Sequence, residues 1–378
     1  IKKGTLGLKG VMQVKNYTHD DYINAINSYP KFWTSIRENT LKTNRYNEEL
    51  NNGVEKIRAI YPQLKPAKIY FTIGALRSNG TTIDSLVLIG SELAMADKNT
   101  NSAEFDENLG AGRRIYFDSN PIDNLVLLNL HEYVHTQQKP RVNNLLSYVL
   151  HEGIAEFVSV IAMNVPSSTP AINYGKQNKK VKQKFEEELF YGNNTHHWLW
   201  SDFKNEFDTR DLGYYIGYAI AEINYNNAIN KQAAIKKMIE LDYTNEADVE
   251  DFVNRTKFFS KPINKLYADF DKSRPTILSI EPVIVDSTTV NPNLKRITLN
   301  FSMPMNVESR GFDYGPLGEN HVLSVQNIIG FTEDAKSFTF EIALEPDKHY
   351  QSLITNRFLS KDGIPLKPFL INFKTSKK

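Results

Sequence analysis

The chain has 378 residues, 40% of them hydrophobic and 11% aromatic, which is enough for two or three domains with substantial buried cores. Its 45 basic and 44 acidic residues nearly cancel, so the charge gives no indication of a nucleic-acid-binding protein. The absence of cysteine excludes disulfides, thiolate metal ligands and cysteine nucleophiles, and no apolar run approaches the length of a membrane-spanning helix.

The first part of the chain is predicted to hold helices followed by short strands. Residues 20–29 and 31–52 carry aromatic residues and leucines at spacings of three and four, which is typical of helices. Asn79-Gly80 favours a hairpin turn between the first two predicted strands. Three stretches rich in β-branched and aromatic residues are predicted to be strands: KIYFTIG (68–74), SLVLIGSEL (85–93) and RRIYFD (113–118).

Long helical patterns dominate the middle of the chain. Pro121 suits the first turn of a helix, which is predicted to run to residue 138 and to stop before Pro140. Residues 143–164 are predicted to form the next helix. The remaining predicted helices are 177–190, 212–229, 231–240 and 246–254.

The sequence pattern changes at Arg274-Pro275. Short alternating stretches follow, separated by Pro, Gly, Asn and Asp: TILSIEPVIV, RITLNFS, SFTFEIAL, YQSLIT and FLINFKT. This pattern is typical of a β-sandwich of about a hundred residues. We therefore predict an α+β chain with two domains, residues 1–273 and 274–378.

Two histidines and a glutamate end the apolar stretch NLVLLNLHEYVHTQQ, residues 124–138. On a helix, His131 and His135 project from one face, where a single zinc ion can take both imidazole nitrogens at about 2.0–2.1 Å. Glu132 points partly aside, where it can reach a water molecule bound to the metal. This H-E-x-x-H arrangement is typical of zinc hydrolases in which the glutamate is the general base.

A catalytic zinc ion needs a third protein ligand, and the stretch HEGIAEF, residues 151–157, offers candidates. Its helix can run antiparallel to the first, because the intervening proline allows a turn. Glu152 and Glu156 share one face of this helix. His151 is the alternative third ligand, but adjacent helical residues point about 100° apart, so His151 and Glu152 cannot both bind well.

The H-E-x-x-H helix followed by a helix with E-x-x-x-E resembles the gluzincin zinc metallopeptidases, the group of thermolysin and aminopeptidase N. The resemblance covers roughly residues 68–230. It implies that Glu152 is the third ligand and that Glu156, four residues later, orients a ligand histidine. The metzincin pattern, which needs glycine and a third histidine close behind the motif, is not met by HEYVHTQQKPR.

Peptide hydrolysis also needs a hydrogen-bond donor for the oxyanion. The Tyr214-x-x-Gly217 spacing is similar to the Y-x-x-G of aminopeptidase N-like enzymes, which implies that Tyr214 is this donor. The alternative is that Tyr214, one of 19 tyrosines, only packs. His196 and His197 are two further candidate donors.

The sequence also departs from the family pattern. It lacks the G-x-M-E-N segment with which aminopeptidase N-like enzymes hold a free α-amino group, since LIGSEL (88–93) shares only a glycine and a glutamate with it. We therefore expect an endopeptidase rather than an aminopeptidase. The resemblance also implies that a strand preceding the metal helix pairs with extended substrate, and SLVLIGSEL or RRIYFD is predicted to do so.

The stretches RPTILSIEP, ITLNFSMPMN and KDGIPLKPFLINFKT resemble bacterial Ig-like domains, which are appended to surface and secreted proteins. Residues 274–378 are accordingly expected to be an accessory module, with carbohydrate or protein binding as the alternative. By association, the protein is expected to be exported, in the periplasm or at the cell surface, with a lipid anchor attached when a leader segment is removed.

The resulting expectation is a zinc-dependent peptidase that acts on peptides or proteins and has no nucleic-acid partner. Zinc is expected on His131, His135 and Glu152, with Glu132 and Tyr214 as catalytic residues. Two alternatives stay open: a non-catalytic surface binding or adhesion protein that keeps a structural metal site, and a metal hydrolase with a non-peptide substrate.

Overall fold

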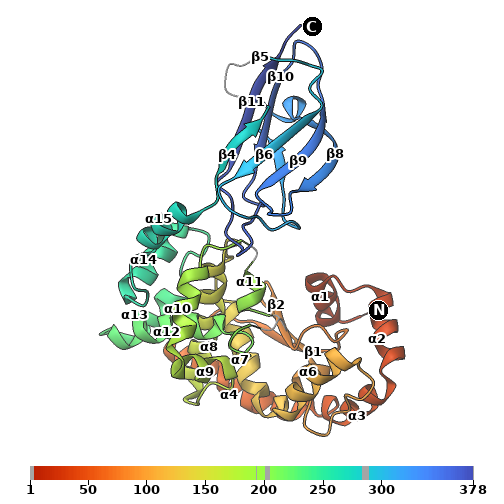
Figure 1. Ribbon diagram of the computed structural model, residues 1–378. Coiled ribbons are helices and arrows are strands. Elements are labelled where there is room, and N and C mark those ends of the chain that lie inside the picture. The colour runs from red at the N-terminus through yellow and green to blue at the C-terminus, as the bar shows by residue number, and fades with distance from the viewer. Residues whose placement is uncertain (1–3, 193, 201–204, 283–288, 378) are drawn as a thin grey trace. The chain divides into compact units, whose positions relative to one another are not determined.

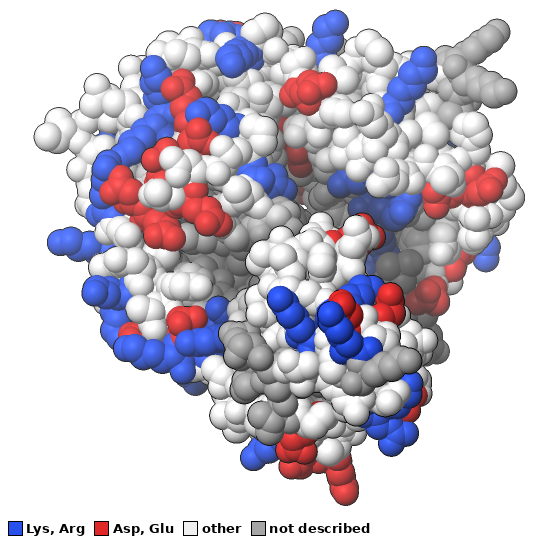
Figure 2. Space-filling model, turned by 90° about the horizontal axis from the view of Figure 1, so that it is seen from above, with Lys and Arg blue, Asp and Glu red and all other residues white. Residues whose placement is uncertain are grey.

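The computed structural model describes residues 4–192, 194–200, 205–282 and 289–377 (Figure 1). The fold is α+β, as predicted, with helices and one small sheet in the first part of the chain and two sheets in the last. The chain divides into two compact units, Ile1–Gln183 with Thr195–Ser260, and Lys184–Asn194 with Lys261–Lys378. Basic and acidic side chains are interspersed on the face shown in Figure 2, in keeping with a formal net charge of +1.

Capped helices open the first unit. Thr5 caps the first of them, which the sequence pattern did not predict, by accepting a hydrogen bond from the Leu8 amide. Thr18 and Asp21 form a reciprocal capping box at the next. The helices are α1 (Leu6–Lys15), α2 (His19–Ser28), α3 (Pro30–Thr40), the 3₁₀ turn η1 (Thr43–Tyr46) and α4 (Asn47–Ile60).

A three-stranded sheet follows, with the order β1-β3-β2. The strands are β1 (Lys68–Thr72), β2 (Gly80–Ile83) and β3 (Leu86–Gly90), and β1 pairs with β3 in parallel while β2 pairs with β3 antiparallel. The predicted hairpin turn at Asn79-Gly80 is therefore wrong, because Gly80 begins a strand of its own. The tight turn lies at Asp84, whose φ of 51° suits it, and the β-branched residues before it extend the missed strand.

The third predicted strand, RRIYFD, is also wrong, because it forms the last part of α6 (Glu107–Asp118). A helical period buries Phe117 completely and places Arg114 one turn before Asp118, 2.9 Å from its carboxylate. The stretch is too short for its aromatic content to distinguish a strand from one face of a helix.

The middle helices carry the candidate site. Residues 121–138 form the 3₁₀ turn η2 (Pro121–Asn124) and then α7 (Leu125–His135), and 143–164 form α8 (Leu145–Met163). The other helices are α9 (Pro170–Gln177), α10 (Lys179–Glu188), α11 (Thr195–Trp198), α12 (Gly213–Asn227), α13 (Lys231–Ile239), α14 (Glu246–Thr256) and α15 (Ile263–Ser273). Within the described ranges α8 alone is long and apolar enough to suit a membrane, contrary to the expectation from the sequence, but 83% of its apolar window is buried, as in a core helix.

Helices α8 and α12 cross in backbone contact. A Cβ atom at Gly217 would lie 1.8 Å from the Val149 carbonyl oxygen, and one at Gly153 would lie 2.2 Å from the Tyr218 nitrogen. Only glycine permits this approach on either helix. The crossing therefore sets the distance from α8 to Tyr214, which lies one turn before Gly217 on α12.

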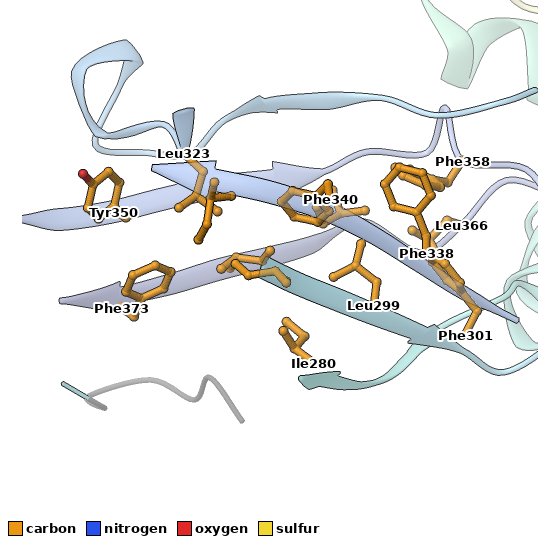
Figure 3. Close-up of a cluster of buried hydrophobic side chains, with 14 of the residues drawn as sticks. Ile280, Leu299, Phe301, Leu323, Phe338, Phe340, Tyr350, Phe358, Leu366 and Phe373 are labelled. Atoms are coloured by element: carbon orange, nitrogen blue, oxygen red, sulfur yellow. The ribbon is translucent and has the colours of Figure 1, made fainter. Parts of the chain in front are cut away.

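The second unit contains two four-stranded sheets, ordered β5-β11-β10-β7 and β4-β6-β9-β8. Strands occupy all five predicted stretches, and β5, β7 and β8 were not predicted. Side chains from both sheets form one buried aromatic and aliphatic core (Figure 3). The strands are β4 (Ile277–Glu281), β5 (Thr289–Val290), β6 (Arg296–Phe301), β7 (Phe312–Tyr314), β8 (Ser324–Phe331), β9 (Ser337–Ala343), β10 (His349–Ile354) and β11 (Phe369–Thr375).

Candidate metal centre

Helix α7 presents the two predicted histidines on one buried face. The Nε2 atoms of His131 and His135 lie 3.0 Å apart, and the two rings meet edge to face with centroids 4.7 Å apart. The apolar residues before them, such as Leu130 and Val134, are fully buried and fix the orientation of the helix. The last turn of α7 therefore delivers both imidazoles to the same point.

Helix α8 brings Glu152 to this point. Its Oε2 atom lies 3.3 Å from Nε2 of His135 and 3.5 Å from Nε2 of His131. Two ligands of a tetrahedral zinc ion, each bound at about 2.0–2.1 Å, are about 3.3 Å apart. The three separations match this spacing, so His131, His135 and Glu152 could hold one metal ion.

The other nitrogen of His131 is held by Glu156. His131 Nδ1 lies 3.1 Å from Oε2 of Glu156, and the second carboxylate oxygen accepts hydrogen bonds from the hydroxyls of Ser167 and Thr169. A carboxylate acceptor fixes the proton on Nδ1, which leaves the Nε2 lone pair directed at the cluster.

The other nitrogen of His135 is held by Gln138, which the sequence did not single out. His135 Nδ1 lies 2.7 Å from the Gln138 side-chain oxygen. The Gln138 amide group donates to the His151 carbonyl oxygen at 3.0 Å and to the Tyr243 hydroxyl at 3.1 Å, which fixes the oxygen toward the histidine. Nδ1 of His135 is thus the donor, and its Nε2 also offers a lone pair to the cluster.

Two lone pairs and a carboxylate at one buried point favour a bound cation, either a metal ion or a proton. Burial lowers the pKa of His131, but its hydrogen bonds to Glu152 and Glu156 outweigh this effect and raise it to about 10. Burial raises the pKa of Glu152, whereas the nearby histidines bring it well below its ordinary value. The chemistry of the cluster suits a divalent metal that displaces this proton.

Glu132 is buried beside the cluster but is not one of its three converging groups. A Cβ atom at Gly80 would lie 2.6 Å from its Oε1 atom, so β2 passes directly over the carboxylate. Burial raises the pKa of Glu132, and the charges of His135 and His131 oppose this shift. Among the described residues, no hydrogen bond engages its oxygens, which leaves them available to a bound molecule.

His151, the alternative third ligand, lies behind His135 rather than beside Glu152 in the cluster. Its ring stacks on that of His135 with centroids 4.6 Å apart, and its Nδ1 atom lies 3.8 Å from Oε1 of Glu152 without a hydrogen bond. Burial lowers the pKa of His151 to about 3, so the ring is neutral. The structure groups Glu152, not His151, with the two histidines.

Tyr214 reaches the cluster from α12. Its hydroxyl donates to Oε2 of Glu152 at 2.9 Å and accepts a hydrogen bond from the Trp200 indole at 3.3 Å. Burial and the charge of Glu152 raise the pKa of Tyr214 well above its ordinary value, so the hydroxyl stays a donor. His196 and His197 lie exposed on α11, their rings edge to face with centroids 4.4 Å apart, and do not belong to the three-residue group.

The chain matches no known family model and no curated protein sequence. Among solved structures, the surface layer protein SbsC, domains 1–6, has 11% identity and a TM-score of 0.21, over 71% of this chain and 37% of that one. The N-terminal part of the bacterial S-layer protein SbsC has 12% identity and a TM-score of 0.20, over 73% of this chain and 67% of that one. The chain thus spans about a third of the first of these structures, and the TM-scores are too low to carry an argument about fold or function.

Proposed function

We propose that the chain is a zinc-dependent peptide-bond hydrolase that cleaves within peptides or proteins. The observation that carries this proposal is the spacing of three ligand atoms, 3.0, 3.3 and 3.5 Å apart, from His131, His135 and Glu152. These three residues would hold a zinc ion, which when bound would supply the polarisation of a water molecule and of the substrate carbonyl.

Glu132 is proposed to move the proton. It takes a proton from the attacking water and passes it to the amide nitrogen that leaves. Burial raises the pKa of this carboxyl group. A higher pKa makes the carboxylate a better acceptor for the proton of the attacking water. A Cβ atom at Gly80 would overlap the carboxylate, so glycine at this position leaves the space that the Glu132 side chain occupies.

Tyr214 is proposed to stabilise the oxyanion. Its hydroxyl already lies at the cluster, 2.9 Å from a ligand oxygen, and is neutral. As negative charge develops on the substrate oxygen, the hydroxyl can exchange Glu152 for this stronger acceptor. The Trp200 indole, at 3.3 Å, orients the hydroxyl during this exchange.

Extended substrate is proposed to pair with β2. The sequence predicted SLVLIGSEL or RRIYFD for this role, but β3 is the central strand with both edges paired and the second stretch is helical. Strand β2 is an edge of the sheet and lies against Glu132 at Gly80. Main-chain hydrogen bonds along this edge would align a scissile peptide beside the base.

The second unit is proposed to be an Ig-like accessory module, and the protein to be exported, in the periplasm or at the cell surface with lipid attachment. The two sheets around one core support the first proposal. Export follows from the association of such modules with secreted proteins.

The test compares zinc-loaded wild-type protein with Glu132→Gln on a mixed peptide library and an unfolded protein substrate. The substitution keeps size and polarity, so zinc content should match wild type while hydrolysis falls about 10²–10⁴-fold. Full zinc loading with no cleavage of any substrate by the wild type would instead favour the non-catalytic binding protein. Cleavage of ester or phosphate libraries alone would favour a non-peptide hydrolase.

A further inference from the structure

An arginine near the cluster of His131, His135 and Glu152 has no anionic partner among the described residues. Arg141 lies between α7 and α8, and its Nε atom is buried without a hydrogen bond. No ion pair engages its guanidinium among the residues that the structure describes. A partly buried guanidinium normally has its donors satisfied, because unpaired donors and charge are costly away from water.

Two aromatic rings hold this guanidinium in place. Its central carbon lies 4.5 Å from the ring centroid of Tyr148 and 5.9 Å from that of Trp200, and these two rings meet edge to face at 5.5 Å. Cation–π contacts occupy the faces of the planar group and leave its N–H edge free. Trp200 is 48% exposed, so the aromatic pair lies where a ligand can reach it.

The same rings connect Arg141 to the metal ligands. Tyr148 precedes Glu152 by four residues on α8, so both side chains lie on one face of that helix. Trp200 donates to the Tyr214 hydroxyl, which donates to Glu152. The positive charge of Arg141 also contributes to lowering the pKa of His151, directly behind the cluster.

We propose that Arg141 binds a substrate carboxylate next to the scissile bond, so that the preferred substrates carry an anionic group there. This inference rests on the proposed peptidase function and adds a substrate class to it. A planar guanidinium with a free edge forms paired, charge-assisted hydrogen bonds with a carboxylate. The carboxylate is either the free C-terminus of the peptide or an acidic side chain.

The experiment measures kcat/KM of the zinc-loaded protein on two matched pairs of N-acetylated peptide pools. One pair differs only in a C-terminal carboxylate or amide, and the other only in an internal Glu or Gln. Wild-type protein should prefer the anionic member of one pair by about 10- to 100-fold, the usual value of hydrogen bonds to a charged group. The pair that shows the preference identifies the source of the carboxylate.

Arg141→Gln should abolish this preference, and Arg141→Lys should keep part of it because the charge remains. Lys139→Gln is the matched control, since it removes an exposed charge two residues away that pairs with Asp242. Equal cleavage of both members by the wild type would overturn the inference. So would loss of the preference in Lys15→Gln but not in Arg141→Gln, because Lys15 is a cation whose charge interacts with Glu132 and Glu152.

A binding measurement separates this inference from the proposed function. Zinc-loaded Glu132→Gln is titrated by calorimetry with the same peptide pools. If the anionic pool binds more tightly and this tighter binding requires Arg141, the carboxylate site is supported. If the wild-type protein at the same time cleaves no peptide, the peptidase function is refuted. Cleavage without any dependence on Arg141 supports the peptidase and refutes the carboxylate site.

Discussion

Two acceptors of different charge orient the two histidines of the cluster. His131 donates to the carboxylate of Glu156, whereas His135 donates to the neutral amide of Gln138. The Glu156 carboxylate helps to raise the pKa of His131, and the Gln138 amide fixes the orientation of the His135 ring. The cluster therefore carries one negative charge, from Glu152, at the point where the histidines converge and a second, from Glu156, behind His131.

Replacing either acceptor should weaken zinc binding without removing a ligand. We expect Glu156→Gln and Gln138→Leu each to raise the zinc dissociation constant about 10- to 100-fold, the usual cost of losing such a partner. Competition with a chromogenic chelator measures this constant. Gln137→Leu is the control, because its side chain bonds to Lys65 and should leave zinc affinity unchanged. Unaltered affinity in both test variants would mean that these contacts do not orient the histidines.

His151 should make the zinc-free protein sensitive to mild acid. Burial lowers its pKa to about 3 in the folded chain, against about 6.5 when unfolded. Between these values only the unfolded state binds the proton, so stability is complete above the higher value and is lost as pH falls, by up to about 1.4 kcal/mol per pH unit. His131, whose pKa is raised to about 10, is protonated in both states below pH 6.5 and adds no slope there.

The measurement is urea unfolding of zinc-free wild type and His151→Gln at several pH values between 7 and 5. The stability advantage of the wild type should shrink as pH falls, because the glutamine does not titrate. An advantage that is independent of pH would show that His151 is not held neutral.

At the residue scale, the sequence pointed to the three converging residues and to Glu156 and Tyr214 beside them, but not to Gln138 or Arg141. His131, His135, Glu152 and Glu156 sit at fixed helical spacings, so a periodic pattern brings each pair to one face. Gln138 and Arg141 lie after α7 has ended, in an irregular connection. The directions of their side chains depend on the path of the connection between α7 and α8, which a periodic sequence pattern cannot predict. Only their polar character next to the motif could have drawn attention to them.

Among the elements, the crossing of α8 and α12 positions Tyr214 relative to Glu152. The glycine of the Y-x-x-G spacing has a direct physical reason here, since a Cβ atom at Gly217 would overlap the Val149 carbonyl at 1.8 Å. A Cβ atom at Gly153 on α8 would likewise overlap the backbone of α12, at 2.2 Å from the Tyr218 nitrogen. The two helices can separate only by moving the hydroxyl away from the cluster.

Gly217→Ala should therefore destabilise the chain by about 1–3 kcal/mol through overpacking and reduce hydrolysis as Tyr214 moves. Gly112→Ala in α6 is the matched control. A Cβ atom there meets nothing within 4 Å, so the higher helix propensity of alanine should stabilise the chain by up to about 1 kcal/mol. Thermal unfolding with a parallel activity assay measures both. A neutral Gly217→Ala would contradict the close crossing.

Short elements limited what could be predicted at this scale. β2 has only four residues. It forms a strand because it pairs with β3 and packs on α7, not because its own sequence pattern is distinctive. RRIYFD has a strand-like composition, yet it forms the end of α6, where Phe117 is fully buried. In both places tertiary contacts decided the structure.

On the scale of the whole molecule, the second unit has a core of its own. Every buried member of that core falls between Ile280 and Phe373, so the strands do not depend on α1 to α14 for burial. The unit also includes residues Lys184–Asn194, where Tyr191 and Gly192 approach Gly363 and Leu359.

Residues 274–378 expressed alone should fold as an all-β module without metal. Circular dichroism should give a strand spectrum and a cooperative melt that zinc does not shift. A chain lacking residues 184–194 loses their contacts with the loop at Gly363, so the melt should occur below that of the same module in the full chain. A disordered spectrum would mean that the module needs its neighbouring segments.

The central claim is that His131, His135 and Glu152 bind one zinc ion, and anomalous X-ray scattering at the zinc edge tests it most directly. A single strong peak is expected about 2.0–2.1 Å from Nε2 of both histidines and from a carboxylate oxygen of Glu152. Glu132→Gln should keep this peak, whereas Glu152→Gln should weaken it. A peak bound by His151 in place of Glu152, or no peak in protein prepared with excess zinc, would show that these three residues do not form a zinc site.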